Sequence, residues 1–156
     1  MQPDILVGGG DYVFGSRDRF AEATSWMRLL QPRLAFIGVL GNHDYWHGSE
    51  QAEKACAAGG MLLLNNERLF IDENRKICFT APRRGLCLAG VGDLWSFPVD
   101  IDKALAGVEE AMPRLLFSHN PAKTLAILLS AIYRRKLDKR PHLCASRDPK
   151  RQRSQL

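Results

Sequence analysis

The chain has 156 residues, of which 46% are hydrophobic and 25% are charged, a composition typical of one globular domain with its own core. No apolar run approaches the roughly 18–20 residues that a membrane-spanning helix needs, and Met1–Asp4 lacks the basic and apolar regions of a secretory signal. The four cysteines show no Cys-x-x-Cys spacing, so we expect reduced thiols in a cytoplasmic protein without a membrane span.

The net charge of +5 is unevenly distributed along the chain. Residues 130–156 contain nine of the 22 Lys and Arg residues and two of the 17 Asp and Glu residues, so this segment carries +7 and the rest carries −2. Basic side chains can contact phosphates, but this segment has almost no aromatic residues for base stacking. We therefore favour a solvated, disordered or divergent tail over a nucleic-acid-binding or anionic-surface-binding segment.

The first expected elements are a strand and a helix. Ile5–Val7 is a short apolar run that ends in Gly8–Gly10, where the backbone can turn tightly and approach a ligand. Residues 16–31 then show helical spacing, with Ser16 as the cap and Pro32 as the end. The apolar face of this helix is expected to carry Phe20, Met27 and Leu30.

A buried parallel strand is expected at 34–40, because these seven residues are apolar, partly β-branched and bounded by Pro32 and Gly41. A helix at 49–58 follows and ends at Gly59-Gly60. Further strands are expected at 61–64, 68–71, 76–81 and 86–91, the last three in a largely antiparallel arrangement.

The C-terminal third has the same alternation. Residues 100–112 show apolar side chains at helical spacing, and 114–117 is an apolar run that we expect as a strand. Asn120 and Pro121 suit the cap and first turn of another helix. The apolar residues of the 100–112 segment are Ile101, Leu105, Val108 and Met112. This order of elements predicts an α/β fold in which helices cover a central sheet.

Three residues of metal-binding type each follow an apolar run predicted as a strand: Asp11, Asn42 and His119. In open α/β sheets ligands bind beyond the carboxyl ends of the strands, so we expect these side chains to converge. A carboxylate can bridge two divalent cations about 3.5–4 Å apart, and such a pair stabilises in-line displacement at phosphorus. Taken singly, each segment has a simpler reading as a turn, a solvated loop or the packing behind a helix cap.

Longer stretches around these residues resemble the calcineurin-like metallophosphoesterases, over roughly residues 3–129. The matching stretches are Pro3–Val13, Gly38–Trp46, Leu63–Glu67, Leu88–Trp95 and Leu115–Pro121. The most specific of them contains the run Gly41-Asn42-His43-Asp44. The resemblance implies an incomplete metallophosphoesterase-type sandwich with a central mixed sheet covered by helices.

The resemblance also implies a role for each matching residue. Asp11 would bridge two divalent metal ions such as Mn, Fe or Zn, and Asn42 and His119 would bind the second ion. His43 would face the phosphate and stabilise or protonate the leaving oxygen. Asp44 would orient His43, with a helix or turn cap as an equally weighted alternative. Further candidates for the substrate mouth, for which we favour core packing or loop exposure, are Tyr45, Trp46, His47, Asp93 and Trp95.

Two other motifs of the family do not occur in the sequence. They are an Asp-Xaa-His upstream of Asp11 and a Gly-His-Xaa-His after the helix that follows His119; the later His142 does not match. We therefore expect a partial metallophosphoesterase domain at 1–129, truncated at both ends, and a divergent tail at 130–156. The two-metal site is expected to be incomplete, and the sheet to have an exposed edge.

The predicted function is metal-dependent hydrolysis of phosphomonoester or phosphodiester bonds in a phosphorylated small molecule, lipid or nucleotide. One alternative is a catalytically inactive remnant of the same fold. Another is binding of nucleic acid or an anionic surface through the 130–156 segment. The sequence does not distinguish among the substrates or metals of the family.

Overall fold

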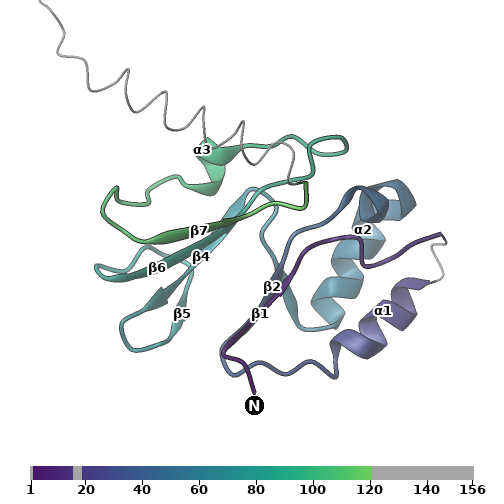
Figure 1. Ribbon diagram of the computed structural model, residues 1–156, viewed down its shortest axis with the longest axis horizontal. Coiled ribbons are helices and arrows are strands. Elements are labelled where there is room, and N and C mark those ends of the chain that lie inside the picture. The colour runs from purple at the N-terminus through teal and green to yellow at the C-terminus, as the bar shows by residue number, and fades with distance from the viewer. Residues whose placement is uncertain (1, 16–18, 121–156) are drawn as a thin grey trace, which may run out of the picture.

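The computed structural model describes residues 2–15 and 19–120, which form two β-sheets flanked by helices (Figure 1). The first sheet is parallel, with the order β1-β2-β3. The second has the order β5-β4-β6-β7, in which only the β6–β7 pair is parallel. The strands are β1 (Ile5–Gly8), β2 (Ala35–Gly38), β3 (Met61–Leu63), β4 (Glu67–Asp72), β5 (Ile77–Cys78), β6 (Gly85–Gly90) and β7 (Arg114–Phe117), and the helices are α1 (Phe20–Met27), α2 (Asn42–Ala58) and α3 (Ile101–Ala104).

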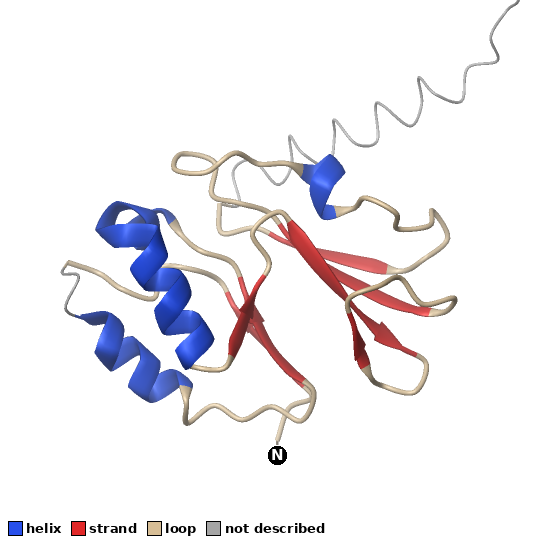
Figure 2. Ribbon diagram, turned by 180° about the vertical axis from the view of Figure 1, so that it is seen from behind, coloured by secondary structure: helices blue, strands red, loops and turns tan. Residues whose placement is uncertain are grey.

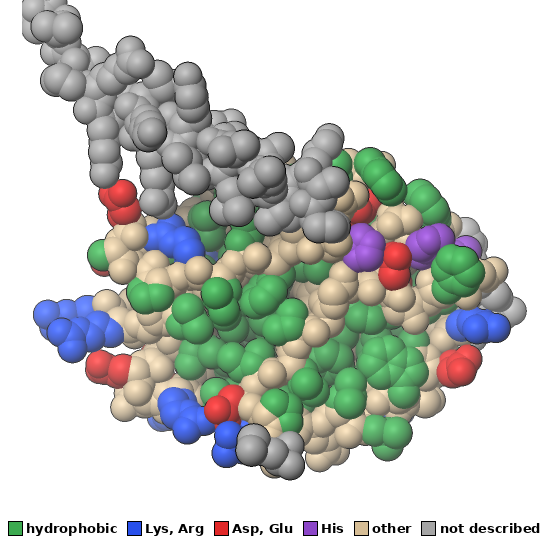
Figure 3. Space-filling model, in the orientation of Figure 1, with side chains coloured by type: hydrophobic (Ala, Val, Ile, Leu, Met, Phe, Trp, Pro, Cys, Tyr) green, Lys and Arg blue, Asp and Glu red, His purple; other side chains and the backbone are tan. Residues whose placement is uncertain are grey.

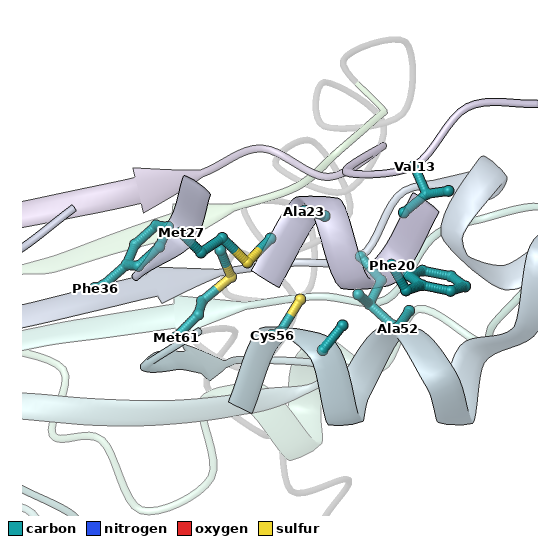
Figure 4. Packing of buried hydrophobic residues seen from close by; sticks show 10 residues of the cluster. Val13, Phe20, Ala23, Met27, Phe36, Ala52, Cys56 and Met61 are labelled. Atoms are coloured by element: carbon teal, nitrogen blue, oxygen red, sulfur yellow. The ribbon is translucent and has the colours of Figure 1, made fainter. Parts of the chain in front are cut away.

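The two sheets pack face to face; α1 and α2 cover the outer face of the first sheet, and the one-turn helix α3 with its neighbouring residues packs on the second (Figure 2). All four residues of β2 are buried, and Ile37 lies between the two sheets against residues of β4 and β6. On the opposite side of the first sheet, α1 and α2 pack around Met27, Met61 and Phe36 (Figure 4). The α/β class and the sandwich are thereby confirmed, with a parallel and a mixed sheet at the centre.

Helix α2 begins earlier than the sequence pattern indicates. We expected a helix at 49–58, but α2 starts at Asn42 and continues through a break at Gly48, whose φ is 128°. The first turn is stabilised by Asp44, whose carboxylate accepts the Gly41 N–H at 2.9 Å. The predicted end before Gly59-Gly60 is confirmed.

The helix expected at 100–112 is wrong beyond its first turn. Helix α3 contains only Ile101–Ala104, and the chain then turns through Gly107, which has a φ of 72°. The apolar residues of this segment still pack on the second sheet, so their spacing marked burial and not a continuous helix. In α1, which ends at Met27, the expected apolar residue Leu30 lies beyond the helix and is 40% exposed.

Other expectations fall on residues that the structure does not describe. These are the Ser16 cap, the helix starting at Asn120-Pro121 and the 130–156 tail. Within residues 2–15 and 19–120, every helix is too short or too polar to traverse a bilayer.

Strands β1 and β7 each lie at an edge of their sheet, as far as the described strands go. Both edges are on the same side of the sandwich, because His119, just after β7, contacts Gly9, just after β1. Val7 is 47% exposed and Leu115 is 52% exposed. Hydrophobic side chains accordingly gather in the middle of the face that Figure 3 presents.

Candidate metal centre

The loop after β1 turns sharply at Gly10 and Asp11. Both residues have positive φ angles, 94° at Gly10 and 56° at Asp11, and this conformation is unfavourable for a residue with a side chain. A Cβ atom at Gly10 would lie 2.5 Å from the Gly41 nitrogen and 2.7 Å from Nδ1 of His119. Glycine is therefore required at position 10 for the three strand exits to meet.

The buried carboxylate of Asp44 holds this turn in place. It accepts hydrogen bonds from the backbone N–H groups of Asp11 (2.8 Å), Tyr12 (2.9 Å) and Val13 (3.3 Å), in addition to Gly41. Burial raises the pKa of the Asp44 carboxyl above its ordinary value, while these N–H groups act in the opposite direction. Asp44 therefore joins the start of α2 to the β1 exit, which is the capping role that the sequence left open.

The backbone of His43 contacts Asp11, and its side chain lies next to aromatic rings. Its N–H donates to Oδ1 of Asp11 at 3.0 Å, so α2 presents its first turn to the carboxylate. The His43 ring centroid lies 4.8 Å from that of Phe14 and 5.0 Å from that of Trp46. Asn42, the first residue of α2, is 9% exposed and directly follows Gly41.

His119 reaches this group of residues from the other sheet. Nδ1 lies 2.7 Å from the Gly9 carbonyl oxygen, and Nε2 lies 3.4 Å from Oδ2 of Asp11. A carbonyl oxygen only accepts, so Nδ1 carries a proton and Nε2 of the neutral ring has a free lone pair. Nε2 and Oδ2 are then two acceptors that face each other, and a cation is needed between them, either a proton on His119 or a metal ion.

Comparison with curated proteins shows relatives over most of the chain. A "Transmembrane protein with metallophosphoesterase domain" of Danio rerio is 29% identical over 131 residues, which cover 78% of this chain and 28% of that protein. An "Uncharacterized metallophosphoesterase" of Helicobacter pylori is 28% identical over 123 residues, covering 76% and 30%. A protein of the same description from Aquifex aeolicus is 34% identical over 71 residues, covering 46% and 27%.

This chain is related to the calcineurin-like metallophosphoesterases. It spans less than a third of the length of the relatives just named. No profile of a known protein family matches the chain, and no solved structure matches it.

The metallophosphoesterases generally use divalent metals, so the donor set of the predicted site can be tested against such ions. The Asp11 carboxylate and the His119 imidazole converge, and their side chains are 31% and 20% exposed, within reach of solvent and ligand. Asn42, which has an amide side chain, follows Gly41, and a Cβ atom at Gly41 would lie only 2.1 Å from Oδ1 of Asp11. Carboxylate, amide and imidazole donors fit a divalent cation such as Mn or Zn whose other positions hold water.

The described residues nevertheless offer only part of a metal site. In the 2–15 and 19–120 ranges, no three His, Cys, Asp or Glu side chains are grouped closely enough to hold an ion. The structure thus brings Asp11 and His119 together and places Asn42 and His43 next to them. The metal-ligand and acid roles of these metallophosphoesterase-type residues, and an orienting role of Asp44 toward His43, stay predictions.

Sequence reasoning missed two contacts at this site and one buried polar residue of the metallophosphoesterase-like fold. The Gly9 carbonyl orients His119, and Phe14 packs against the His43 ring. Asn66, with a φ of 57°, accepts the Gly92 and Asp100 N–H groups and donates to the Pro98 carbonyl. Asn in a short turn between two strands is the signal for such a left-handed residue.

Proposed function

We propose that this chain carries the central part of a two-metal phosphoesterase site and takes part in metal-dependent hydrolysis of phosphomonoester or phosphodiester bonds. The observation that supports this best is the approach of His119 Nε2 to Asp11 Oδ2 at 3.4 Å, because the two side chains come from the ends of strands in different sheets. Since the relatives are named metallophosphoesterases and the chain spans less than a third of them, its own activity is part of the proposal.

Each residue has a separate task in this proposal. Asp11, Asn42 and His119 would hold a divalent metal ion, which would supply a more acidic water and charge neutralisation at the phosphate. The Gly9 carbonyl keeps the His119 proton on Nδ1, so that Nε2 is available as a ligand. His43 delivers a proton to the leaving oxygen from its position beside Asp11. Asp44 holds the turn at Asp11 against the start of α2.

The proposal predicts that Mn²⁺ binding depends on Asp11 and His119. In calorimetric titrations with Mn²⁺, Asp11→Asn and His119→Ala should each weaken the affinity at least about tenfold, because each removes a ligand. Asp72→Asn is the matched control, since Asp72 caps the β4–β5 turn away from the site and should not change the affinity. Equal Mn²⁺ affinities in all three variants would contradict the proposed site.

Turnover separates the enzyme from its non-catalytic alternative. The Mn²⁺-loaded chain should hydrolyse p-nitrophenyl phosphomonoesters or phosphodiesters, and His43→Ala should slow this reaction about 100-fold or more while Mn²⁺ still binds. Stoichiometric Mn²⁺ without any hydrolysis would identify a metal-binding remnant of the fold. The alternative of nucleic-acid or anionic-surface binding concerns 130–156, outside the described part of the chain.

A further inference from the structure

Two large, exposed aromatic side chains lie next to the His43 ring. Phe14 is 70% exposed and Trp46 is 57% exposed. The Phe14 and His43 rings are inclined at 60°, and the His43 and Trp46 rings at 71°. We call these three side chains the His43 aromatic face.

The aromatic face belongs to the same two segments as the metal centre. Phe14 follows Asp11 by three residues on the β1 exit loop, and Trp46 lies four residues after Asn42 in α2. The backbone of His43 itself donates to Asp11. In Figure 3, histidine and acidic side chains accordingly lie together with hydrophobic ones at one end of the visible face.

Packing of the fold does not require these two side chains. The loop after β1 is anchored by Val13, which is 1% exposed and belongs to the core around α1 and α2. The first turns of α2 are anchored by Tyr45, whose ring stacks on Phe97 at 5.6 Å. Phe14 and Trp46 are thus exposed next to well-packed neighbours, and their apolar surface beside a polar centre is available to a ligand.

We propose that the His43 aromatic face binds an aromatic leaving group of the phosphoester, a ring joined directly to the leaving oxygen. This inference rests on the proposed function, in which His43 protonates that oxygen, so the group bonded to the oxygen lies against Phe14 and Trp46. The Phe14 and Trp46 rings are both steeply inclined to the His43 ring, which suits edge-to-face contact with a single ring. A nucleobase, separated from its phosphate by a sugar, would lie farther from His43.

The test compares the binding of two phosphomonoesters, which differ only in the group on the leaving oxygen, to the Mn²⁺-loaded full chain. By calorimetry, phenyl phosphate should bind about three- to tenfold more tightly than methyl phosphate, the preference expected for aromatic contacts. Phe14→Ala and Trp46→Ala should each reduce this preference to nearly one. Phe79→Ala is the matched control, because Phe79 is 71% exposed after β5 in the second sheet, and it should keep the full preference.

Several outcomes would overturn the inference. A phenyl-to-methyl ratio of one in the unchanged chain contradicts it, and so does an equal loss of preference in Phe79→Ala and Trp46→Ala. Adenosine monophosphate binding more tightly than ribose 5-phosphate, without a phenyl preference, would assign the face to a nucleobase instead. Failure of Mn²⁺ to bind contradicts the proposed function, whereas normal Mn²⁺ binding with a ratio of one contradicts only this inference. Circular dichroism and the thermal midpoint check that each variant is folded.

Discussion

Replacing Asp44 with alanine is expected to lower the free energy of unfolding by about 3–5 kcal/mol and to abolish Mn²⁺ binding. The change removes a fully buried carboxylate and leaves the N–H groups of Asp11, Tyr12, Val13 and Gly41 without their acceptor. Unsatisfied buried donors cost about 1–3 kcal/mol each, and partial relaxation keeps the total below their sum. Chemical denaturation followed by circular dichroism measures the loss.

The matched control for this prediction is Asp72→Ala. Asp72 also accepts two backbone N–H groups, from Asn74 and Lys76, but in an exposed turn where water replaces the carboxylate. We expect this variant to lose about 1 kcal/mol or less. A similar loss in both variants would show that Asp44 is only one more turn cap and not the connection between β1 and α2.

Replacing Gly10 with alanine is the second change with a large expected effect. The left-handed backbone costs about 1–2 kcal/mol for a residue with a Cβ atom, and the contacts of that atom with Gly41 and His119 add about 1–3 kcal/mol. The chain should therefore lose about 2–5 kcal/mol of stability. Because the Cβ atom pushes His119 away from Asp11, Mn²⁺ affinity should fall with it.

Gly9→Ala provides a control within the same glycine run. A Cβ atom at Gly9 would have no heavy atom within 4 Å, and the carbonyl that holds His119 would remain. Its stability should stay within about 0.5 kcal/mol of the unchanged chain, with full Mn²⁺ affinity. Equal effects at positions 9 and 10 would mean that the close approach of the three strand exits is not what Gly10 provides.

The places where β1 and β2 end could be predicted from the sequence, because apolar runs are almost the only information that parallel pairing needs. Residues 35–38 are buried on both faces, so this strand is central, and its neighbour β1 pairs in register from Ile5↔Ala35 to Gly8↔Gly38. That register brings the chain at Asp11 beside Gly41. This proximity could be predicted because the apolar runs and the glycines that end them are visible in the sequence.

The errors came from contacts that local patterns do not contain. The start of α2 depends on Asp44, a residue inside the first turn whose role shows only when the β1 loop lies against it. The apolar spacing at 100–112 is satisfied by a single helical turn and a chain that turns back at Gly107. The contact of His119 with Gly9 depends on the relative position of the two sheets. Sheet-on-sheet packing produces no short-range periodicity in the sequence, so this contact could not be predicted.

His119 extends from the second sheet and contacts the first at Gly9 and Asp11. An ion held by Asp11 and His119 would therefore add a polar link between two sheets that also pack through apolar side chains. By mass action, such an ion at 100 times its dissociation constant adds about 2.7 kcal/mol to the folded state. The free energy of unfolding would then rise with the concentration of divalent ions, and loss of the ion would remove the link between His119 and Asp11.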